Sequence, residues 1–344
     1  MAGAALAAVA LSLAACSSSN TTGGSSSSSL SGTLNGSGST FQLTFQQTAI
    51  QSFKQIQSGM TVNYGGGGSG KGRTDLAGGV VQFAGSDSPI PPEEKAGFKG
   101  KTVLYFPVVI GPITVSYNLS GVSSLKLSAP VIADLFQGKI KKWNDPAIAA
   151  DNPGVTLPST PVTIARRSDS SGTTKNFSQF LVDAAPNWKL GSDSTISWPA
   201  TSRGGSGNGG VAQIVKSTPG AVGYVDFSDA KASGLTYASV KNKDGNFIAP
   251  SVQSATTAAE NATVAPDLTF SAIWASGAQS YPVTYQSWDL VYQKQSSANT
   301  AKMLKAYIGY LLGDGQKLLP GLNYAPLPAS LDQKAKSQLS KISS

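Results

Sequence analysis

The stretch 162–181, VTIARRSDSSGTTKNFSQFL, contains the pattern that decides the fold: a strand, a polar turn and a helix in direct succession. Residues 162–165 read as a short apolar strand. Phe177 and Phe180 then recur at helical spacing within 173–181, which predicts an amphipathic helix there. Strands that alternate with helices in this way predict an α/β protein with open, mainly parallel sheets.

The same apolar patterns predict further elements along the chain. Helices are expected at 41–57, 129–136, 211–215 and around 301–311, and strands at 61–64, 80–84, 102–109 and 221–225. Turns rich in Gly, Ser and Thr stand at 36–41, 64–73, 85–89 and 166–174. In open sheets a ligand binds beyond the carboxyl ends of the strands, where helix N-termini supply N–H groups. These turns are therefore suited to an oxyanion.

Length and composition exclude several function classes. The 344 residues allow two domains with a core in each. There is no histidine, which excludes Ser-His-Asp and Cys-His catalysis and histidine-ligated zinc. The single cysteine, Cys16, excludes an intrachain disulfide and a thiolate metal cluster. The net charge of +8 suits an anionic partner, but the basic residues form no stripe, so we expect a small anion and no nucleic acid.

The N-terminal residues resemble a lipoprotein signal. The run 4–15, AALAAVALSLAA, is too short for a membrane span and suits a signal-peptide core. It ends in Leu-Ala-Ala before Cys16, as in a bacterial lipobox, in which the cysteine becomes the lipidated first residue. We expect a signal segment over 1–16 and a Ser/Gly-rich tether over 17–32, which place the protein on the extracytoplasmic face of the cell membrane or in the periplasm. The alternative is an ordinary secretory signal in which Cys16 has no role.

The glycine-rich segment 64–72, YGGGGSGKG, almost matches the P-loop pattern GxxxxGK[ST]. Its last position is Gly72, so the hydroxyl that would hold Mg²⁺ is missing. We expect instead a loop in which Ser69 and the backbone contact an anion. A merely flexible glycine loop is the alternative.

The turn 166–173, which follows the expected strand 162–165, combines a charge with hydrogen-bond donors. Arg167 can hold a tetrahedral oxyanion through two parallel hydrogen bonds, and Asp169 can fix the guanidinium from behind. Ser171, Gly172 and Thr173 place hydroxyls and N–H groups at the positive end of the helix. Alone, each feature fits a plain helix cap or a surface charge. Their adjacency favours an anion site.

Six sequence blocks in a fixed order carry a resemblance to a known family. They are GSGSTF at 36–41, VNY at 62–64 leading to GSG at 68–70, GSDSP at 85–89, GKIKKW at 138–143, RRSDSSGT at 166–173 and PGAVGYV at 219–225. In order and spacing the chain resembles the substrate-binding proteins of bacterial phosphate ABC transporters over residues 33 to about 340.

The resemblance implies a two-lobed periplasmic-binding-protein fold of type II. Each lobe would be an open mixed or parallel sheet flanked by helices, and the lobes would be hinged around a central ligand cleft. The chain would cross between the lobes near Tyr117 and again near Thr284. Lobe 1 is then 33–116 together with 285–344, and lobe 2 is 117–284.

The resemblance also implies the binding residues. By matched position, phosphate would be bound by Thr40, Phe41, Ser69 and Asp87 from lobe 1 and by Arg167, Ser171, Gly172 and Thr173 from lobe 2, with Asp169 behind the arginine. Phe41 would contribute mainly its N–H. The chain departs from the family at Ser37 and Ser39, where alanine-like residues are expected, and at Gln42, where proline is usual.

The implied function is capture of inorganic phosphate outside the cytoplasmic membrane and delivery to a membrane permease driven by an ATPase. The binding protein would be a monomer, not an enzyme, with no cofactor and no metal. Asp87 would select phosphate, which carries a proton at pH 7, over sulfate, which does not. The alternatives are a binding protein for another oxyanion such as sulfate or molybdate, and a secreted phosphate-releasing enzyme. The second usually needs clustered metal ligands, which the sequence does not offer. A purely structural cell-surface protein would leave Arg167 and Asp87 unexplained.

Overall fold

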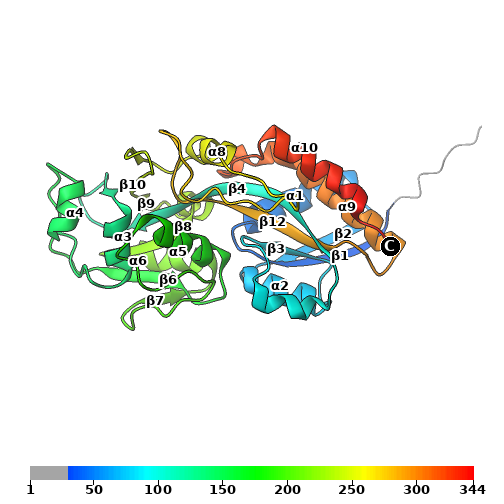
Figure 1. Cartoon of the computed structure of the whole chain (residues 1–344), viewed down its shortest axis with the longest axis horizontal. Coiled ribbons are helices and arrows are strands. Elements are labelled where there is room, and N and C mark those ends of the chain that lie inside the picture. The colour runs from blue at the N-terminus through cyan, green and yellow to red at the C-terminus, as the bar shows by residue number, and fades with distance from the viewer. Residues whose placement is uncertain (1–29) are drawn as a thin grey trace, which may run out of the picture.

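The computed structural model describes residues 30–344, which fold into an α/β protein (Figure 1). The predicted signal segment, Cys16 and most of the predicted tether lie outside the described residues. The strands are β1 (Gly32–Gly38), β2 (Met60–Gly65), β3 (Phe83–Ser86), β4 (Val103–Tyr117), β5 (Lys126–Leu127), β6 (Thr163–Arg167), β7 (Arg203–Gly205), β8 (Ala221–Asp226), β9 (Thr236–Tyr237), β10 (Ser239–Lys241), β11 (Phe247–Ile248) and β12 (Thr284–Tyr292).

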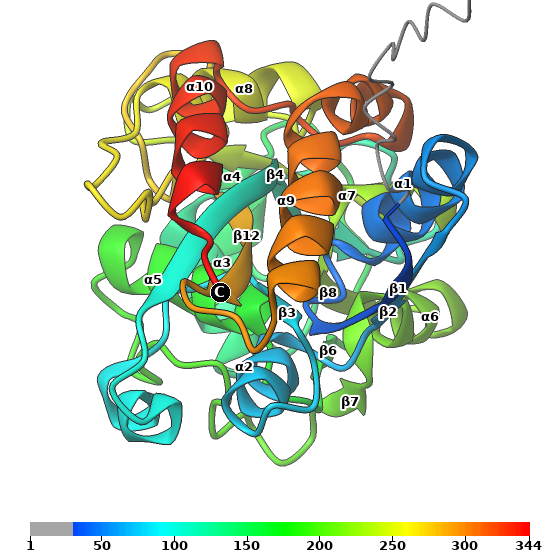
Figure 2. The ribbon, with the colours of Figure 1, turned by 90° about the vertical axis from the view of Figure 1, so that its right-hand side faces the viewer.

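Helices cover both faces of these strands. The α-helices are α1 (Leu43–Ile56), α2 (Ser69–Ala77), α3 (Ala129–Phe136), α4 (Pro146–Asp151), α5 (Gly172–Ala184), α6 (Gly207–Ser217), α7 (Phe227–Ala232), α8 (Val252–Glu260), α9 (Ala298–Leu312) and α10 (Ala329–Gln338). Short 3₁₀ helices occupy Pro92–Phe98, Asp314–Leu318, Pro320–Leu322 and Leu339–Lys341. Seen from the end that carries the C-terminus, α1 and α9 lie on one side of β1, β2 and β3, and α2 lies on the other (Figure 2).

One nine-stranded sheet runs through the molecule in the order β2-β1-β3-β12-β4-β8-β6-β7, with β9 also beside β4. A separate small sheet has the order β11-β10-β5. In the large sheet β1 is parallel to β2 and β3, and β6 is parallel to β7 and β8. Its antiparallel pairs all include β4 or β12. The predicted α/β class with mixed sheets is therefore confirmed, and β4 and β12 supply the antiparallel part.

Strand β4 changes its neighbour along its length. Residues 103–112 pair with β12, and residues 113–117 pair with β8. In Figure 1, β4 and β12 run side by side between one part of the molecule with β1, β2 and β3 and another with β6, β7 and β8. Almost every residue of β4 is buried, which suits its near-continuous apolar sequence VLYFPVVIGPITVSY. The strand reaches well beyond the predicted 102–109, because its pairing continues through Gly111 and Pro112 on β12 and passes to β8 at Ile113.

The predicted helices and strands agree with the structure best where one apolar face repeats regularly. Helix α3 has the predicted bounds 129–136, and α1 buries Phe45, Ala49 and Phe53 as its spacing indicates. The strand expected at 80–84 begins only at Phe83. The reason is that the N–H of Val80 donates to the Asp75 carbonyl (2.8 Å) and so still closes the end of α2.

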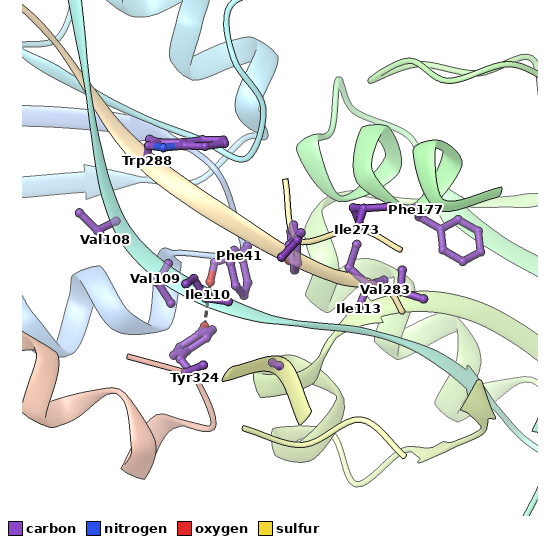
Figure 3. Close-up of a cluster of buried hydrophobic side chains, with 14 of the residues drawn as sticks. Phe41, Val108, Val109, Ile110, Ile113, Phe177, Ile273, Val283, Trp288 and Tyr324 are labelled. Carbon is purple, nitrogen blue, oxygen red and sulfur yellow. Dashed lines mark hydrogen bonds between the residues drawn. The ribbon is translucent and has the colours of Figure 1, made fainter. Parts of the chain in front are cut away.

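The hydrophobic core passes through the junction that β4 and β12 form (Figure 3). Phe41 is fully buried there against β4, and its ring stacks on Tyr285 with centroids 4.1 Å apart. The hydroxyl of Tyr324 donates to the Phe41 carbonyl at 2.8 Å. This packing fixes the backbone of the turn before α1 relative to the central strands.

Candidate functional site

Ser69, Asp87 and Gly172 meet at the ends of three elements. Ser69 begins α2, Asp87 follows β3, and Gly172 begins α5. The N–H of Asp87 donates to Ser69 Oγ (3.1 Å), and Ser69 Oγ lies 3.3 Å from Asp87 Oδ2. A Cβ on Gly172 would lie 2.3 Å from Ser69 Oγ and 2.5 Å from Asp87 Oδ2, so only glycine fits this approach. The structure thus brings together three of the predicted site residues from distant parts of the sequence.

Arg167 stands at the end of β6 as a buried, oriented cation with 1% of its side chain exposed. Its Nε donates to Asp169 Oδ1 (2.8 Å), its Nη2 donates to Asp169 Oδ2, and its Nη1 donates to Thr173 Oγ1 (3.2 Å). Burial alone would lower the pKa of Arg167, but the hydrogen bonds and charge of Asp169 outweigh it and raise the pKa. Asp169 also accepts from the N–H of Gly207 (3.1 Å). The guanidinium therefore stays charged and has a fixed orientation.

Thr40 and Thr173 are joined through a residue that the sequence analysis did not predict. Asn208 Nδ2 donates to Thr40 Oγ1 (3.2 Å) and lies 3.4 Å from Thr173 Oγ1. Asn208 is fully buried and belongs to the first turn of α6. Its sequence signal was available: the segment 204–210, GGSGNGG, is another glycine-rich turn between a strand and a helix.

Phe41 and Ser171 have local backbone roles in this structure. The N–H of Phe41 donates to Ser39 Oγ at 3.1 Å. Ser171 is the N-cap of α5, since its Oγ accepts from the N–H of Thr174 at 3.1 Å. An N-cap hydroxyl that accepts from the backbone still has its own hydrogen to donate. Ser171 thus still offers a donor, whereas the N–H of Phe41 is already used by Ser39 in this structure. Contact of either residue with a ligand stays a prediction.

Asp87 differs from Asp169 because no cation within residues 30–344 contacts its carboxylate. It is 1% exposed, and its Oδ1 accepts from Ser287 Oγ on β12 at 2.5 Å. Burial raises the pKa of Asp87 above its ordinary value, while hydrogen bonds from Ser287, Ser39 and Ser69 and the charge of Arg167 oppose this rise. Ser287 was not predicted, and its place within a strand gave no sign of the contact.

Hydrogen bonds also join the two parts of the molecule that β4 and β12 connect. Asn176 Nδ2 of α5 donates to the Asp87 carbonyl (2.7 Å), and the N–H of Gly70 donates to the Ser170 carbonyl (3.1 Å). A cavity of about 350 Å³ opens beside this contact, and Asp87, Lys175 and Gln286 are among its lining residues. A larger cavity of about 660 Å³ lies between α10 and the segment 264–268, away from Arg167 and Asp87.

The segment that resembled a P-loop folds differently from one. Ser69 begins α2, and Gly72 packs directly on β1: a Cβ there would lie 2.7 Å from both Gly38 Cα and the Ser37 carbonyl oxygen. Close packing therefore explains the glycine at a position where a P-loop needs a hydroxyl. In residues 30–344, no three His, Cys, Asp or Glu side chains come together as a metal-binding group.

Two buried polar atoms of the central strands β8 and β12 have no hydrogen-bond partner within residues 30–344. They are the Tyr285 hydroxyl and Asp226 Oδ2. Burial raises the pKa of Asp226 well above its ordinary value, and the neighbouring Asp229 adds to this effect.

None of the helices in residues 30–344 has the length and apolar character that a bilayer span requires.

Comparisons with known proteins agree with this architecture. A solved structure of a high-affinity periplasmic phosphate-binding protein bound with phosphate superposes with a TM-score of 0.74 at 19% identity, over 89% of this chain and 94% of that chain. The phosphate-binding protein of Stenotrophomonas maltophilia superposes with a TM-score of 0.71 at 18% identity, over 89% and 93%. At these identities the likeness concerns the fold.

Sequence comparison gives the family. The model of the PBP superfamily domain matches residues 23–315. The phosphate-binding protein PstS 3 of Mycobacterium leprae is 37% identical over 88% of this chain and 85% of its own length. The phosphate-binding protein PstS of Pasteurella multocida is 35% identical over 89% of both chains. The chain belongs to the PBP superfamily and, within it, to the family of the PstS phosphate-binding proteins.

Proposed function

We propose that this protein captures inorganic phosphate outside the cytoplasmic membrane and delivers it to the permease of an ABC transporter. The proposal rests on one observation: the site holds both a buried cation and a separate buried carboxylate. The cation is Arg167, whose orientation is fixed, and the carboxylate is Asp87, which no cation within residues 30–344 contacts. The hydroxyls of Ser69 and Ser287 contact Asp87, and the hydroxyl of Thr173 contacts Arg167. This inventory matches an oxyanion that carries negative charge and also a proton.

The proposed phosphate ligands are the eight predicted residues. They are Thr40, Phe41, Ser69, Asp87, Arg167, Ser171, Gly172 and Thr173, with Asp169 holding the guanidinium of Arg167. The family membership and the convergence of Ser69, Asp87 and Gly172 support this set. Asn208 joins it as a buried residue that links Thr40 to Thr173.

Asp87 gives the site its selectivity. An ionised carboxylate can only accept hydrogen bonds, so it is satisfied by a ligand proton and repels a bare oxyanion. Phosphate carries a proton at neutral pH as the monoanion and as the dianion, and sulfate carries none. A site with Arg167 alone would bind both anions.

The proposed lobes are 33–116 with 285–344, and 117–284. The pairing pattern supports a hinge in β4 and β12, because β4 pairs with β12 up to Pro112 and with β8 from Ile113. A ligand that touches residues of both lobes stabilises the closed arrangement over the open one. The Asn176–Asp87 hydrogen bond is a contact that opening would break.

Delivery requires partners on the membrane. We expect the loaded monomer to dock on the permease, an ATPase to drive release, and no reaction to take place at Asp87 or Arg167.

We also expect Cys16 to carry the lipid that tethers the protein to the extracytoplasmic face of the membrane. If Cys16→Ser protein still enters the detergent phase in a phase-separation assay, the anchor proposal is wrong.

Titration calorimetry tests the function directly. We expect the purified protein to bind phosphate tightly at pH 7 and to bind sulfate at least 10³-fold more weakly, in line with the ~10⁴-fold penalty of an unmatched polar group. Tight binding of sulfate or molybdate instead would favour another oxyanion. Turnover of a chromogenic phosphate ester would favour a phosphate-releasing enzyme. Either result would overturn the proposal.

A further inference from the structure

A line of buried polar side chains leads from Asp87 into the interior between α1 and β12. After Ser287 it continues through Gln42 and Gln46 to Asp289, and all four residues are at most 2% exposed. Gln42 Nε2 lies 2.7 Å from Ser287 Oγ, and Gln46 Nε2 lies 2.9 Å from Gln42 Oε1. Gln46 Nε2 also donates to Asp289 (3.1 Å to Oδ2). Such a chain in a core is costly unless each member is satisfied.

The direction of this chain is fixed by a backbone carbonyl. Gln42 Nε2 donates to the Trp288 carbonyl oxygen at 2.9 Å. A carbonyl oxygen cannot donate, so the NH₂ group of Gln42, and not its oxygen, must face β12. The other end agrees, because Gln42 Oε1 accepts from Gln46 and Gln46 Oε1 accepts from the Tyr307 hydroxyl at 2.6 Å.

The orientation of Gln42 decides what Ser287 can do. The NH₂ group of Gln42 has no acceptor capacity, so the Ser287 oxygen must accept from it. The single hydrogen of the Ser287 hydroxyl is then left for Asp87 Oδ1, at 2.5 Å. A serine without the glutamine could turn its hydrogen elsewhere.

Asp87 Oδ1 is therefore held as an acceptor, while Oδ2 lies at the longer distance of 3.3 Å from Ser69 Oγ. The other titratable groups that face Asp87 are Arg167, whose charge favours the carboxylate, and the hydroxyls of Tyr64 and Tyr285, which lie within its field. A hydrogen bond to the charged form of a buried acid favours that form. Among the hydrogen bonds to Asp87, the one from Ser287 thus does most to keep the carboxylate ionised, so that it can accept a ligand proton.

We propose that Gln42 and Ser287 are positioning residues that hold Asp87 as an acceptor and thereby set the oxyanion selectivity of the site and the pH range over which it operates. The inference rests on the proposed function and names residues outside the predicted ligand set.

The test compares Ser287→Ala with Gln42→Met and with a matched control, Tyr307→Phe. Removal of a hydrogen bond to a charged group costs about 10- to 100-fold in affinity. We expect Ser287→Ala to lose phosphate affinity by that factor at pH 7. The acid limb of binding should move up by about one to two pH units, because loss of the bond raises the pKa of Asp87. Gln42→Met should also lower the phosphate affinity and move the acid limb to higher pH, with smaller changes than in Ser287→Ala.

Sulfate is the sharper probe, because a protonated Asp87 can donate to it. In Ser287→Ala, sulfate binding should appear at a higher pH than in the parent protein. Tyr307→Phe removes only the far hydroxyl, so it should lower the melting temperature and leave selectivity and pH profile unchanged. Ser287→Thr keeps a hydroxyl and should restore the parent profile.

A folded Ser287→Ala with the parent's phosphate-to-sulfate ratio and pH profile would overturn the inference and leave the proposed function intact. A parent protein that binds no phosphate would overturn the function first. If Ser287→Ala does not fold, Gln42→Met gives the same reading by calorimetry. A Tyr307→Phe variant that shifts selectivity as much as Ser287→Ala would also overturn it, because the effect would then follow general loosening of the core.

Discussion

Asp169 and Asp87 are two aspartates of the same site with opposite surroundings. Asp169 contacts the guanidinium of Arg167, and although burial raises its pKa, that contact lowers it overall. Asp87 is more deeply buried and receives hydrogen bonds from neutral groups, and its pKa is raised. The paired acid therefore keeps its charge and fixes geometry. The acid without a contacting cation has a protonation state that its hydrogen bonds can tune, which suits it to discriminate between ligands.

The largest expected effect is at the tunable acid. Asp87→Asn replaces a group that only accepts with one that also donates, so sulfate should become a ligand. The phosphate-to-sulfate preference should shrink by orders of magnitude, up to ~10⁴-fold. Calorimetry of parent and variant with both anions at pH 7 measures this. Rejection of sulfate by Asp87→Asn as strong as in the parent would place the discriminating group elsewhere.

The next effect is at the cation of the paired acid. Arg167→Ala should weaken phosphate binding by roughly 2 to 5 kcal/mol, the range for removal of one partner of a buried, hydrogen-bonded charge pair. Arg166 is the matched control, because it is adjacent in sequence but bonds to Ser202 Oγ and to the Arg167 carbonyl. Equal losses in Arg166→Ala and Arg167→Ala would mean that overall charge, and not a positioned guanidinium, holds the ligand.

A third acid extends the comparison to stability. Asp289 is fully buried without a cation, and burial raises its pKa to about 7. The unfolded chain ionises this group near pH 4, so the folded state holds an extra proton between about pH 4 and pH 7. Stability should therefore fall as pH rises through this window. Asp289→Asn should remove the part of this slope that Asp289 contributes, while the buried Asp87 and Asp226, whose pKa values are also raised, keep theirs. The variant should gain at most about 4 kcal/mol at pH 8 relative to the parent.

Urea unfolding at pH 5 and at pH 8 measures the slope. Asp314→Asn is the control, because Asp314 is exposed on the surface beside Lys317 and should leave the slope unchanged. If the parent and Asp289→Asn show the same change in stability between pH 5 and pH 8, Asp289 is already ionised in the folded state at pH 5.

The smallest expected effect is at the paired acid itself. Asp169→Asn keeps the shape of the side chain and loosens the guanidinium, while the bond from Arg167 to Thr173 remains. We expect a loss of about 1 kcal/mol in phosphate binding, the usual size of one hydrogen bond. The phosphate-to-sulfate ratio should stay as in the parent. A change in that ratio as large as in Asp87→Asn would remove the distinction between the two acids.

Much of the fold could be predicted because it follows local patterns. Helices α1 and α9 have one apolar face, α3 is an apolar segment buried on nearly all sides, and the turns rich in Gly and Ser mark strand ends. Strand β1 was missed, because GTLNGSG has one apolar side chain, Leu34. It is a strand because β2 and β3 pair with it on both sides. The part of β4 beyond residue 109 was missed for a similar reason, since β12 and then β8 pair with it on either side of Pro112.

The residues of the candidate site also fall into those that a local sequence pattern indicates and those that only distant contacts bring to the site. Its motif residues, such as Arg167 and Gly172, stand in turns whose composition already indicates an anion. Asn208 had a signal in its glycine-rich turn that was not used. Ser287 and Gln42 had none that a sequence pattern could supply, because their contact joins positions 245 residues apart. The departure at Gln42 was visible, and its role was not.

The sequence determined the succession of strands, turns and helices, the identity of the cation and of the acids, and the absence of histidine and of disulfide chemistry. These properties depend on residue type and on neighbours within a few positions. The pairing of Arg167 with Asp169, two residues away, was also predicted from the sequence. The tertiary structure decided that Asp87 is buried without a contacting cation within residues 30–344, and how Ser287 is turned toward it. Burial and hydrogen-bond direction arise only when distant strands meet, and they govern the protonation of Asp87, on which the proposed selectivity rests.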